Sequence, residues 1–289
     1  MLTTEGVLPT LITLSQELRD LDIGRSVPEV AAPLDPLQFL RTYVASNKPV
    51  LIQGSISHWP ALRLWTNAYL IKALAEQKVT VASTPSGRAD AICWQGGKPV
   101  FALPHEEQLP IATAFGTTAE AANIWIGSHR SMTSFHRDHY ENIYAVVAGT
   151  KRFFLVPPCD RYRMRIMDVP VARYTPGPDG WELVLESPER KVPWCALDES
   201  LTDVTSHQSV DAAPLPEPLV VDVHAGEVLY LPSLWYHMVQ QQDDDAGRVI
   251  AVNWWYDMQY DCKYAYAQLI DSLSRTCIGK SDAPVLDQQ

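Results

Sequence analysis

Two potential metal ligands lie two residues apart in the stretch SMTSFHRDHYENIY, residues 131–144. His136 and Asp138 are separated only by Arg137, and the surrounding residues favour a β-strand. Side chains at positions i and i+2 of a strand point to the same face, so this imidazole and this carboxylate can lie side by side. Arg137 then points to the other face. A transition metal could use this pair, but it would need a third ligand from another strand.

The segment LPSLWYHMV, residues 231–239, supplies a candidate for that third ligand, His237. Two histidines and one carboxylate occupy one face of an octahedral metal and leave three positions open, which suits non-haem Fe(II) and oxygen chemistry. Zinc hydrolases more often use a closer set of nitrogen and sulfur ligands and need one open position. On residue types alone a simpler interpretation stays open, because an HxD pair can be hydrogen-bonded structure and a histidine among aromatics can be core.

The bulk composition excludes several classes of protein. With 289 residues and 46% apolar composition, the chain can bury a sizeable core. The net charge of −11 argues against a nucleic acid as an obligatory partner and permits a basic protein substrate. Five scattered cysteines without a CxxC pair indicate reduced thiols in the cytoplasm or the nucleus. Neither a signal peptide nor an apolar run of the ~18–20 residues that span a membrane is expected.

Helical and strand-like patterns alternate unevenly along the chain. Helices are predicted over residues 11–23, 36–47, 64–77 and 260–275, the second opened by Asp35 and Pro36. Strands are predicted over residues 48–54, 78–84, 123–128, 132–138, 142–149, 151–158, 219–225, 227–232, 235–241 and 248–257. The turn at residues 148–150 is predicted to close a hairpin. Residues 157–220 are predicted as mostly loop, with one strand at WELVLE, residues 181–186.

Many short strands with glycine and proline turns favour a mainly β fold. The expected architecture is a double-stranded β-helix, which is a cupin-like jelly roll, with helices packed outside it at both ends of the chain. The expected division is an N-terminal helix and linker over residues 1–35, a catalytic domain over residues 36–258, and a C-terminal helix over residues 259–289.

Several stretches, in this order, resemble a known family. They include NKPVLIQG (47–54), HRDHYENIYAVVAGTKRFFLVPP (136–158), KVPW (191–194), GEVLYLPSLWYH (226–237) and AVNWWYD (251–257). Their order and spacing are similar to those of the JmjC family of Fe(II)- and 2-oxoglutarate-dependent oxygenases. The resemblance extends from about residue 36 to residue 275. Within the family it is strongest to members that hydroxylate lysyl residues of GTP-binding proteins.

The resemblance implies a role for each candidate site residue. Fe(II) would be bound by His136, Asp138 and His237. The co-substrates would be dioxygen and 2-oxoglutarate, and the residues implied to contact 2-oxoglutarate are Thr133, Asn142, Tyr144, Lys151 and Asn253. Lys151 would pair with the carboxylate far from the metal. Apart from the resemblance, Lys151 could be a surface lysine, and the other four could be ordinary strand, core or turn residues.

The resemblance implies hydroxylation of a lysyl side chain in a protein such as a GTP-binding protein. Demethylation of methyl-lysine and hydroxylation of tRNA on the same fold are the alternatives. A binding module with little cofactor is a third, because residues 110–122 are shorter than the family stretch that carries a cofactor-binding tyrosine. Relatives dimerise through the C-terminal region, which implies a homodimer through the C-terminal helix, although this helix could also dock on its own barrel.

Overall fold

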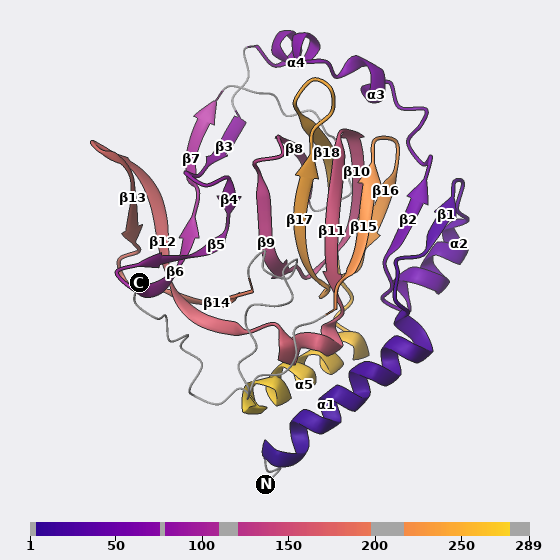
Figure 1. The fold of residues 1–289 in the computed structure, drawn as a ribbon. Coiled ribbons are helices and arrows are strands. Elements are labelled where there is room, and N and C mark those ends of the chain that lie inside the picture. The colour runs from indigo at the N-terminus through magenta and orange to yellow at the C-terminus, as the bar shows by residue number, and fades with distance from the viewer. Residues whose placement is uncertain (1–3, 76–78, 110–120, 198–216, 278–289) are drawn as a thin grey trace.

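Two β-sheets face each other in the centre of the molecule (Figure 1). The structure is a computed structural model that describes residues 4–75, 79–109, 121–197 and 217–277. The first sheet has, in order, β1 (Glu29–Ala31), β2 (Val50–Gln53), β16 (Val228–Leu231), β10 (Tyr140–Ala148), β18 (Val249–Asp257) and β8 (Ala121–Gly127). The second has β15 (Leu219–His224), β11 (Thr150–Val156), β17 (Tyr236–Gln242), β9 (Met132–Arg137) and β4 (Arg88–Ala89). The predicted double-stranded β-helix is confirmed.

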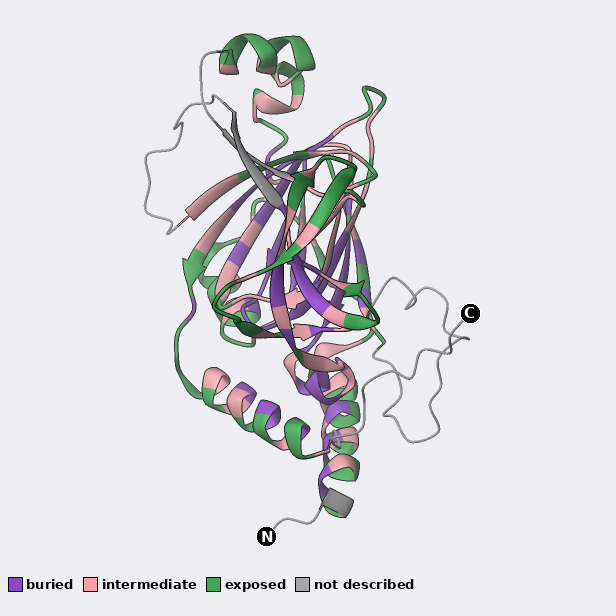
Figure 2. Cartoon of the chain, turned by 90° about the vertical axis from the view of Figure 1, so that its left-hand side faces the viewer, coloured by how far each residue is buried: buried purple, intermediate pink, exposed green. Residues whose placement is uncertain are grey.

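Alternating residues of the strands fill the space between the sheets. Tyr144 and Val146 of β10 pack into one buried cluster with Phe153 and Leu155 of β11. Figure 2 shows buried residues concentrated along these strands. Fully burying a side chain of this size stabilises a fold by about 1.5–3 kcal/mol. The period of two in the sequence therefore decides which side chains face the opposite sheet.

The turn at Gly149 does not close a hairpin, and this prediction was wrong. β10 pairs with β16 and β18, whereas β11 pairs with β15 and β17, so the turn carries the chain from one sheet to the other. Gly149 has a φ of 70°, which favours glycine. A Cβ there would lie 2.7 Å from the carbonyl oxygen of Gln242 and 3.0 Å from that of Arg248. The crossing therefore depends on a residue without a side chain.

Gly149→Ala is expected to lower the free energy of unfolding by about 3 kcal/mol, because backbone strain adds to a clash with backbone atoms. Gly97→Ala is the matched control. Gly97 has a similar φ of 75°, but its Cβ would meet nothing within 4 Å. That variant should lose only about 1 kcal/mol, from backbone strain. Denaturant unfolding measures both, and equal losses would contradict the steric part of the explanation.

Residues 166–195 form strands where mostly loop was predicted. β12 (Ile166–Gly177), β13 (Gly180–Leu185) and β14 (Lys191–Cys195) join β5 (Ala91–Gln95) and β6 (Lys98–Leu103) in a further sheet. Only the strand expected at residues 181–186 corresponds, to β13. Pro170 and Pro176 in β12 argue against a strand on local grounds. The long-range pairing of β12 with β6 outweighs that local signal. β3 (Val79–Ser83) and β7 (His105–Leu109) pair with each other in a separate two-stranded sheet.

Helices lie outside the sheets. They are α1 (Thr4–Leu18), η1 (Arg19–Ile23), α2 (Pro36–Phe39), η2 (Leu40–Val44), α3 (Ala61–Leu64), α4 (Asn67–Leu74), η3 (Pro158–Arg163) and α5 (Cys262–Cys277). Asp35 caps α2 by accepting from the backbone nitrogen of Gln38 at 2.9 Å, so the predicted start is confirmed. The helix predicted over residues 64–77 is present as α4 but begins later than predicted, because Leu64 is the last residue of α3. Thr66 caps a new helix, α4, by accepting from the nitrogen of Tyr69.

The C-terminal helix α5 packs on its own chain. Ile270 of α5 is buried with Val7 and Leu11 of α1 and Tyr162 of η3. Figure 1 shows α5 and α1 below the ends of the sheets. This face of α5 is therefore covered within one copy, and a homodimer through the helix stays a prediction. No helix in the described ranges is long and apolar enough to cross a membrane.

Candidate metal centre

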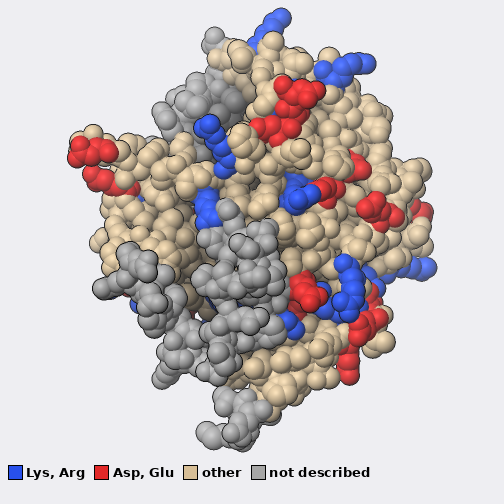
Figure 3. Space-filling view, in the orientation of Figure 1, with Lys and Arg blue, Asp and Glu red and all other residues tan. Residues whose placement is uncertain are grey.

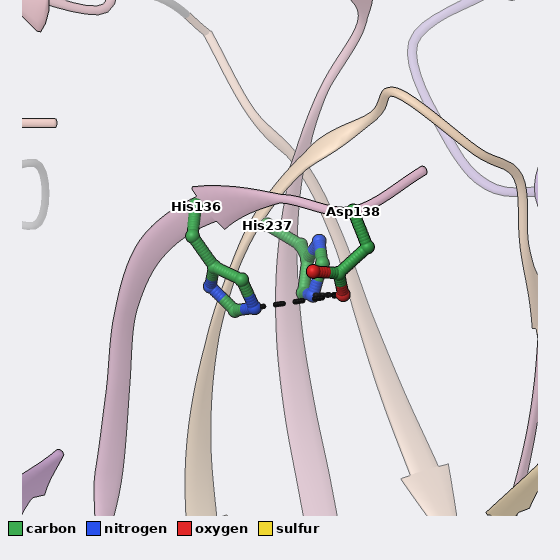
Figure 4. A group of neighbouring side chains, drawn as sticks. All are labelled: His136, Asp138 and His237. Carbon is green, nitrogen blue, oxygen red and sulfur yellow. Dashed lines mark ion pairs between the residues drawn. The ribbon is translucent and has the colours of Figure 1, made fainter. Parts of the chain in front are cut away.

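Three side chains converge at the ends of two paired strands. His136 is in β9, Asp138 follows that strand directly, and His237 lies in β17, opposite His136 in the antiparallel register. Figure 4 shows the two imidazoles and the carboxylate pointing toward one another. Nε2 of His136 and Nε2 of His237 lie 3.7 and 3.8 Å from the same oxygen, Oδ2 of Asp138. All three ligand atoms lie within 4.8 Å of one another, which leaves room for an ion between them.

Backbone carbonyls fix the tautomer of both histidines. Nδ1 of His136 lies 2.8 Å from the carbonyl oxygen of Ser134, and Nδ1 of His237 lies 3.1 Å from that of Trp235. Because a carbonyl only accepts, each Nδ1 carries a proton, and in the neutral form of the ring Nε2 presents its lone pair toward Asp138. Burial, with the neighbouring His136, lowers the pKa of His237 to about 4. This imidazole is therefore neutral at neutral pH, the form that binds a metal.

The donor set fits Fe(II). It consists of two imidazole nitrogens and one carboxylate oxygen, all arriving from the same pair of strands, so the opposite side is free for other ligands. Within the described ranges it is also the one group of three or more histidine, cysteine or acidic residues that could hold an ion.

A buried cation lies on the same face of the sheet. In the register of β11 with β17, Leu155 pairs with His237 and Lys151 pairs with Gln241, so these residues share a face. Nζ of Lys151 donates to Oε1 of Gln241. The amide nitrogen of Gln241 donates to the carbonyl oxygens of Ser128 and Ser131, at 2.8 and 3.0 Å, which turns Oε1 toward the lysine.

Lys151 has no ion pair with the acidic residues that the structure describes, and burial alone lowers its pKa to about 8. Burying an ammonium without a counter-charge is unfavourable. An anionic ligand group would supply that charge. The simpler interpretation of Lys151 as a surface residue is wrong, since the side chain is only 6% exposed.

Two buried amides face each other on the opposite sheet. Nδ2 of Asn253 donates to Oδ1 of Asn142 at 3.0 Å, and Nε1 of Trp125 donates to Oδ1 of Asn253 at 2.8 Å. Tyr144 pairs with Asn253 in register and packs edge-on against Phe153, with ring centres 5.1 Å apart. Burial raises the pKa of Tyr144 far above its ordinary value, so its hydroxyl stays protonated. Neither asparagine caps a turn.

An irregularity in the strand pairing turns Thr133 toward the histidines. His136 pairs with His237, and Thr133 pairs with Val239. The two paired positions are three residues apart on β9 but only two residues apart on β17. In regular strands, residues three apart point to opposite faces. The extra residue on β9 places Thr133 and His136 on the same face. The structure thus brings all eight predicted site residues to the inner faces of the two sheets.

Comparison with known proteins shows which family the chain resembles. Residues 36–111 and 98–262 match the family described as a cupin-like domain. The Homo sapiens bifunctional peptidase and (3S)-lysyl hydroxylase JMJD7 is 35% identical over 321 aligned positions, covering 94% of this chain and 96% of that protein. Lysine-specific demethylase JMJ32 of Arabidopsis thaliana is 38% identical over 310 positions, covering 90% of each. JmjC domain-containing protein E of Dictyostelium discoideum is 29% identical over 334 positions, covering 91% and 92%.

The chain belongs to the JmjC family. The family predicted from the sequence is thereby confirmed, and so is the enzyme class, 2-oxoglutarate-dependent dioxygenase. The stretch in which the JmjC pattern carries a further tyrosine corresponds here to residues 110–122. Residues 110–120 lie outside the described residues, and the structure shows nothing of that prediction.

Sequence reasoning missed three side chains of the JmjC site. Trp194 of β14 stacks on His136, with ring centres 6.0 Å apart and planes 7° apart, and its Nε1 donates to Oγ of Ser134 at 3.2 Å. Gln241 orients Lys151, and Trp125 orients Asn253. The stretch KVPW was part of the family resemblance, but nothing in its residue types indicated a contact with His136. Such contacts depend on which strands become neighbours.

Proposed function

We propose that this JmjC protein is an Fe(II)- and 2-oxoglutarate-dependent hydroxylase that acts on a lysyl side chain of another protein. The observation that carries the proposal is an open set of three candidate metal ligands on the same sheet face as a buried lysine that has no ion pair with any described carboxylate. One site binds a metal, and the other binds an anion. The similarity to JMJD7, which is named a (3S)-lysyl hydroxylase, supports the choice of reaction.

Each residue of the site has a proposed role. His136, Asp138 and His237 would hold Fe(II), and Lys151 with Thr133 would hold the far carboxylate of 2-oxoglutarate. When bound, the metal and 2-oxoglutarate supply the oxidising power with dioxygen. The chain itself keeps the buried imidazole of His237 neutral, fixes the direction of both imidazoles through backbone carbonyls, and screens His136 with Trp194. Asn142, Tyr144 and Asn253 would form the polar wall opposite.

Lysine is the proposed target because the chain carries a net charge of −11, which attracts a cationic substrate. GTP-binding proteins are the first candidates, from the resemblance of the sequence to their hydroxylases. The five cysteines are free, which fits a reaction in the cytoplasm or the nucleus. A tRNA substrate is less favoured, because basic and acidic side chains are interspersed on the face shown in Figure 3.

Demethylation of methyl-lysine is the second candidate, because JMJ32, at 38% identity, is named a lysine-specific demethylase. The products separate the two reactions. Hydroxylation of a lysyl carbon leaves the hydroxyl on the peptide, and hydroxylation of an N-methyl group releases that group as formaldehyde.

The test incubates the iron-loaded protein with 2-oxoglutarate and matched peptides that carry either lysine or methyl-lysine. A gain of one oxygen on unmodified lysine, coupled to succinate, supports the proposal. Formaldehyde from the methylated peptide alone would replace it with demethylation. If succinate formed with neither peptide nor with intact GTP-binding proteins, both reactions would be rejected.

Affinity for 2-oxoglutarate is expected to fall as the pH rises above about 8. The ligand-free pKa of Lys151 is about 8, and a bound carboxylate would raise it, so binding favours the protonated lysine. The dissociation constant should rise by up to about tenfold per pH unit above that pKa. Calorimetric titration from pH 7 to 9.5 measures it, and Lys151→Arg, which does not titrate in this range, should show no such rise. A parallel rise in both proteins would exclude Lys151 as the cause.

The stability of the ligand-free protein should change in the opposite direction. The folded pKa of about 8 lies below the ordinary value of 10.5, so the unfolded chain binds more protons between these two values. The free energy contributed by Lys151 to folding therefore rises with pH across that window.

A further inference from the structure

One carboxylate on α5 is surrounded by three arginines from three parts of the chain. Oδ1 of Asp271 accepts from Nε of Arg161 in η3 at 2.6 Å and lies 3.6 Å from Nη2 of Arg137 in β9. Oδ2 lies 3.1 Å from Nη2 of Arg275, one helical turn further along α5. Asp271 is 7% exposed, and its neighbouring arginines outweigh burial and lower its pKa. The carboxylate is therefore charged at neutral pH and links α5 to the second sheet.

The arginine of β9 in this group stands between two proposed metal ligands. Arg137 separates His136 from Asp138 and points to the opposite face of the strand, toward α5. Its guanidinium carbon lies 5.3 Å from the ring centre of Tyr236, which is opposite Arg137 in register and directly precedes His237. The outer face of both ligand-bearing strands is thus held at the positions next to the ligands.

This placement matters because Asp138 lies beyond the last residue of β9. The strand ends at Arg137, and the carbonyl oxygen of Asp138 accepts from the nitrogen of Leu234 at 2.8 Å. The direction of the Asp138 side chain therefore depends on how the end of β9 is fixed. Arg137 is the last ladder residue, and Asp271 is the described carboxylate to which it is ion-paired.

We infer that Asp271 is a positioning residue for the metal centre: through Arg137 it fixes the end of β9, so that His136 and Asp138 direct their ligand atoms to one point. The inference rests on the function proposed above. It gives α5, which carries none of the ligands, a role in metal binding. Partners that orient metal ligands contribute to affinity because they lower the disorder of the ligands before the ion arrives.

A second buried carboxylate shows what a purely structural role looks like. Asp160 of η3 accepts from Ser15 of α1 and Arg19 of η1, which ties these helices to η3, and none of these contacts reaches β9. Asp160 and Asp271 thus both hold a helix on the barrel. Only Asp271 is also linked to the residue between the ligands.

The test is calorimetric titration of Mn²⁺ into the metal-free full chain, with denaturant unfolding measured in parallel. Asp271→Asn should weaken Mn²⁺ binding by about tenfold. Arg137→Met leaves the Asp271–Arg161 contact in place and should give the same loss, and the double variant should lose no more than either. Arg275→Gln is the matched control, because it removes another partner of the same carboxylate without touching β9 and should bind Mn²⁺ normally. Asp160→Asn should lower stability and leave the affinity unchanged.

Each outcome decides the inference. Equal Mn²⁺ affinity in Arg137→Met and the unchanged protein would overturn it, even if Asp271→Asn proved too unstable to titrate. Additive losses in the double variant would overturn it too, because the two residues would then act separately. If the unchanged protein bound no Mn²⁺, the proposed oxygenase function would fall together with this inference. If the unchanged protein bound Mn²⁺ and the variants bound it with the same affinity, this inference would be overturned and the proposed function would stand without it.

Discussion

Replacing Asp138 with alanine is expected to abolish metal-dependent turnover of 2-oxoglutarate. Both Nε2 atoms face the same oxygen of this side chain, at 3.7 and 3.8 Å, so its loss removes the one anionic ligand and the centre of the group. Two imidazoles would be left to hold a divalent cation. Since even the outer partners of ligands are worth 10–100-fold in affinity or activity, the loss of a ligand should exceed about 100-fold.

His139→Ala is the control for that prediction. His139 is the next residue, its side chain is exposed, and its ring centre lies 6.4 Å from that of Tyr264. Its removal should leave both Mn²⁺ affinity and succinate formation unchanged. If Asp138→Ala still formed succinate at the rate of the unchanged protein, the three-ligand assignment would be abandoned. If His139→Ala lost activity while Asp138→Ala did not, the metal would have to be bound on the side of the chain to which His139 points.

Lys151→Met is expected to separate ligand binding from folding. A charged hydrogen bond to a ligand carboxylate is worth about 1.5–3 kcal/mol, so affinity for 2-oxoglutarate should fall by about 10–100-fold. The stability of the ligand-free protein should change little, because the variant loses one bond to Gln241 but also removes an ammonium buried without a counter-charge. Methionine fills much of the same volume.

Calorimetric titration and thermal unfolding with and without 2-oxoglutarate measure both effects. The unchanged protein should be stabilised by the ligand, and Lys151→Met should lose most of that stabilisation. Arg152→Met is the control, because Arg152 is the next residue, points to the outer face, and pairs with Asp222 in an exposed salt bridge. A normal affinity in Lys151→Met would show that the ligand's anion binds elsewhere.

Local rules of the sequence reached part of the site. The period of a strand correctly placed His136 and Asp138 on one side, and the composition around residue 237 gave the third member of the group. The family resemblance added the fold and the residues of the opposite wall. The fold and the placement of these residues were predictable because they depend on residues close together in the chain or on a pattern that spans most of it.

Features that depend on long-range neighbours could not be predicted. The strand β12 contains two prolines and is held by β6, about seventy residues earlier, so local propensity predicted loop. The extra residue of β9 that turns Thr133 inward is visible only once β17 lies beside it. The same holds for Trp194 on His136 and for Gln241 beside Lys151, since each contact joins separate strands.

The pairing of β9 with β17 also bears on the order in which the chain becomes active. His136 and His237 are opposite each other in the ladder, yet roughly a hundred residues separate them along the chain. At a synthesis rate of about 5–20 residues per second, the nascent chain carries the first two proposed metal ligands for several seconds before the third leaves the ribosome. An ion that met the incomplete pair in that interval would be held only weakly. The choice of metal is therefore postponed until folding is almost finished, when the mature pocket, rather than the growing polypeptide, selects what it binds.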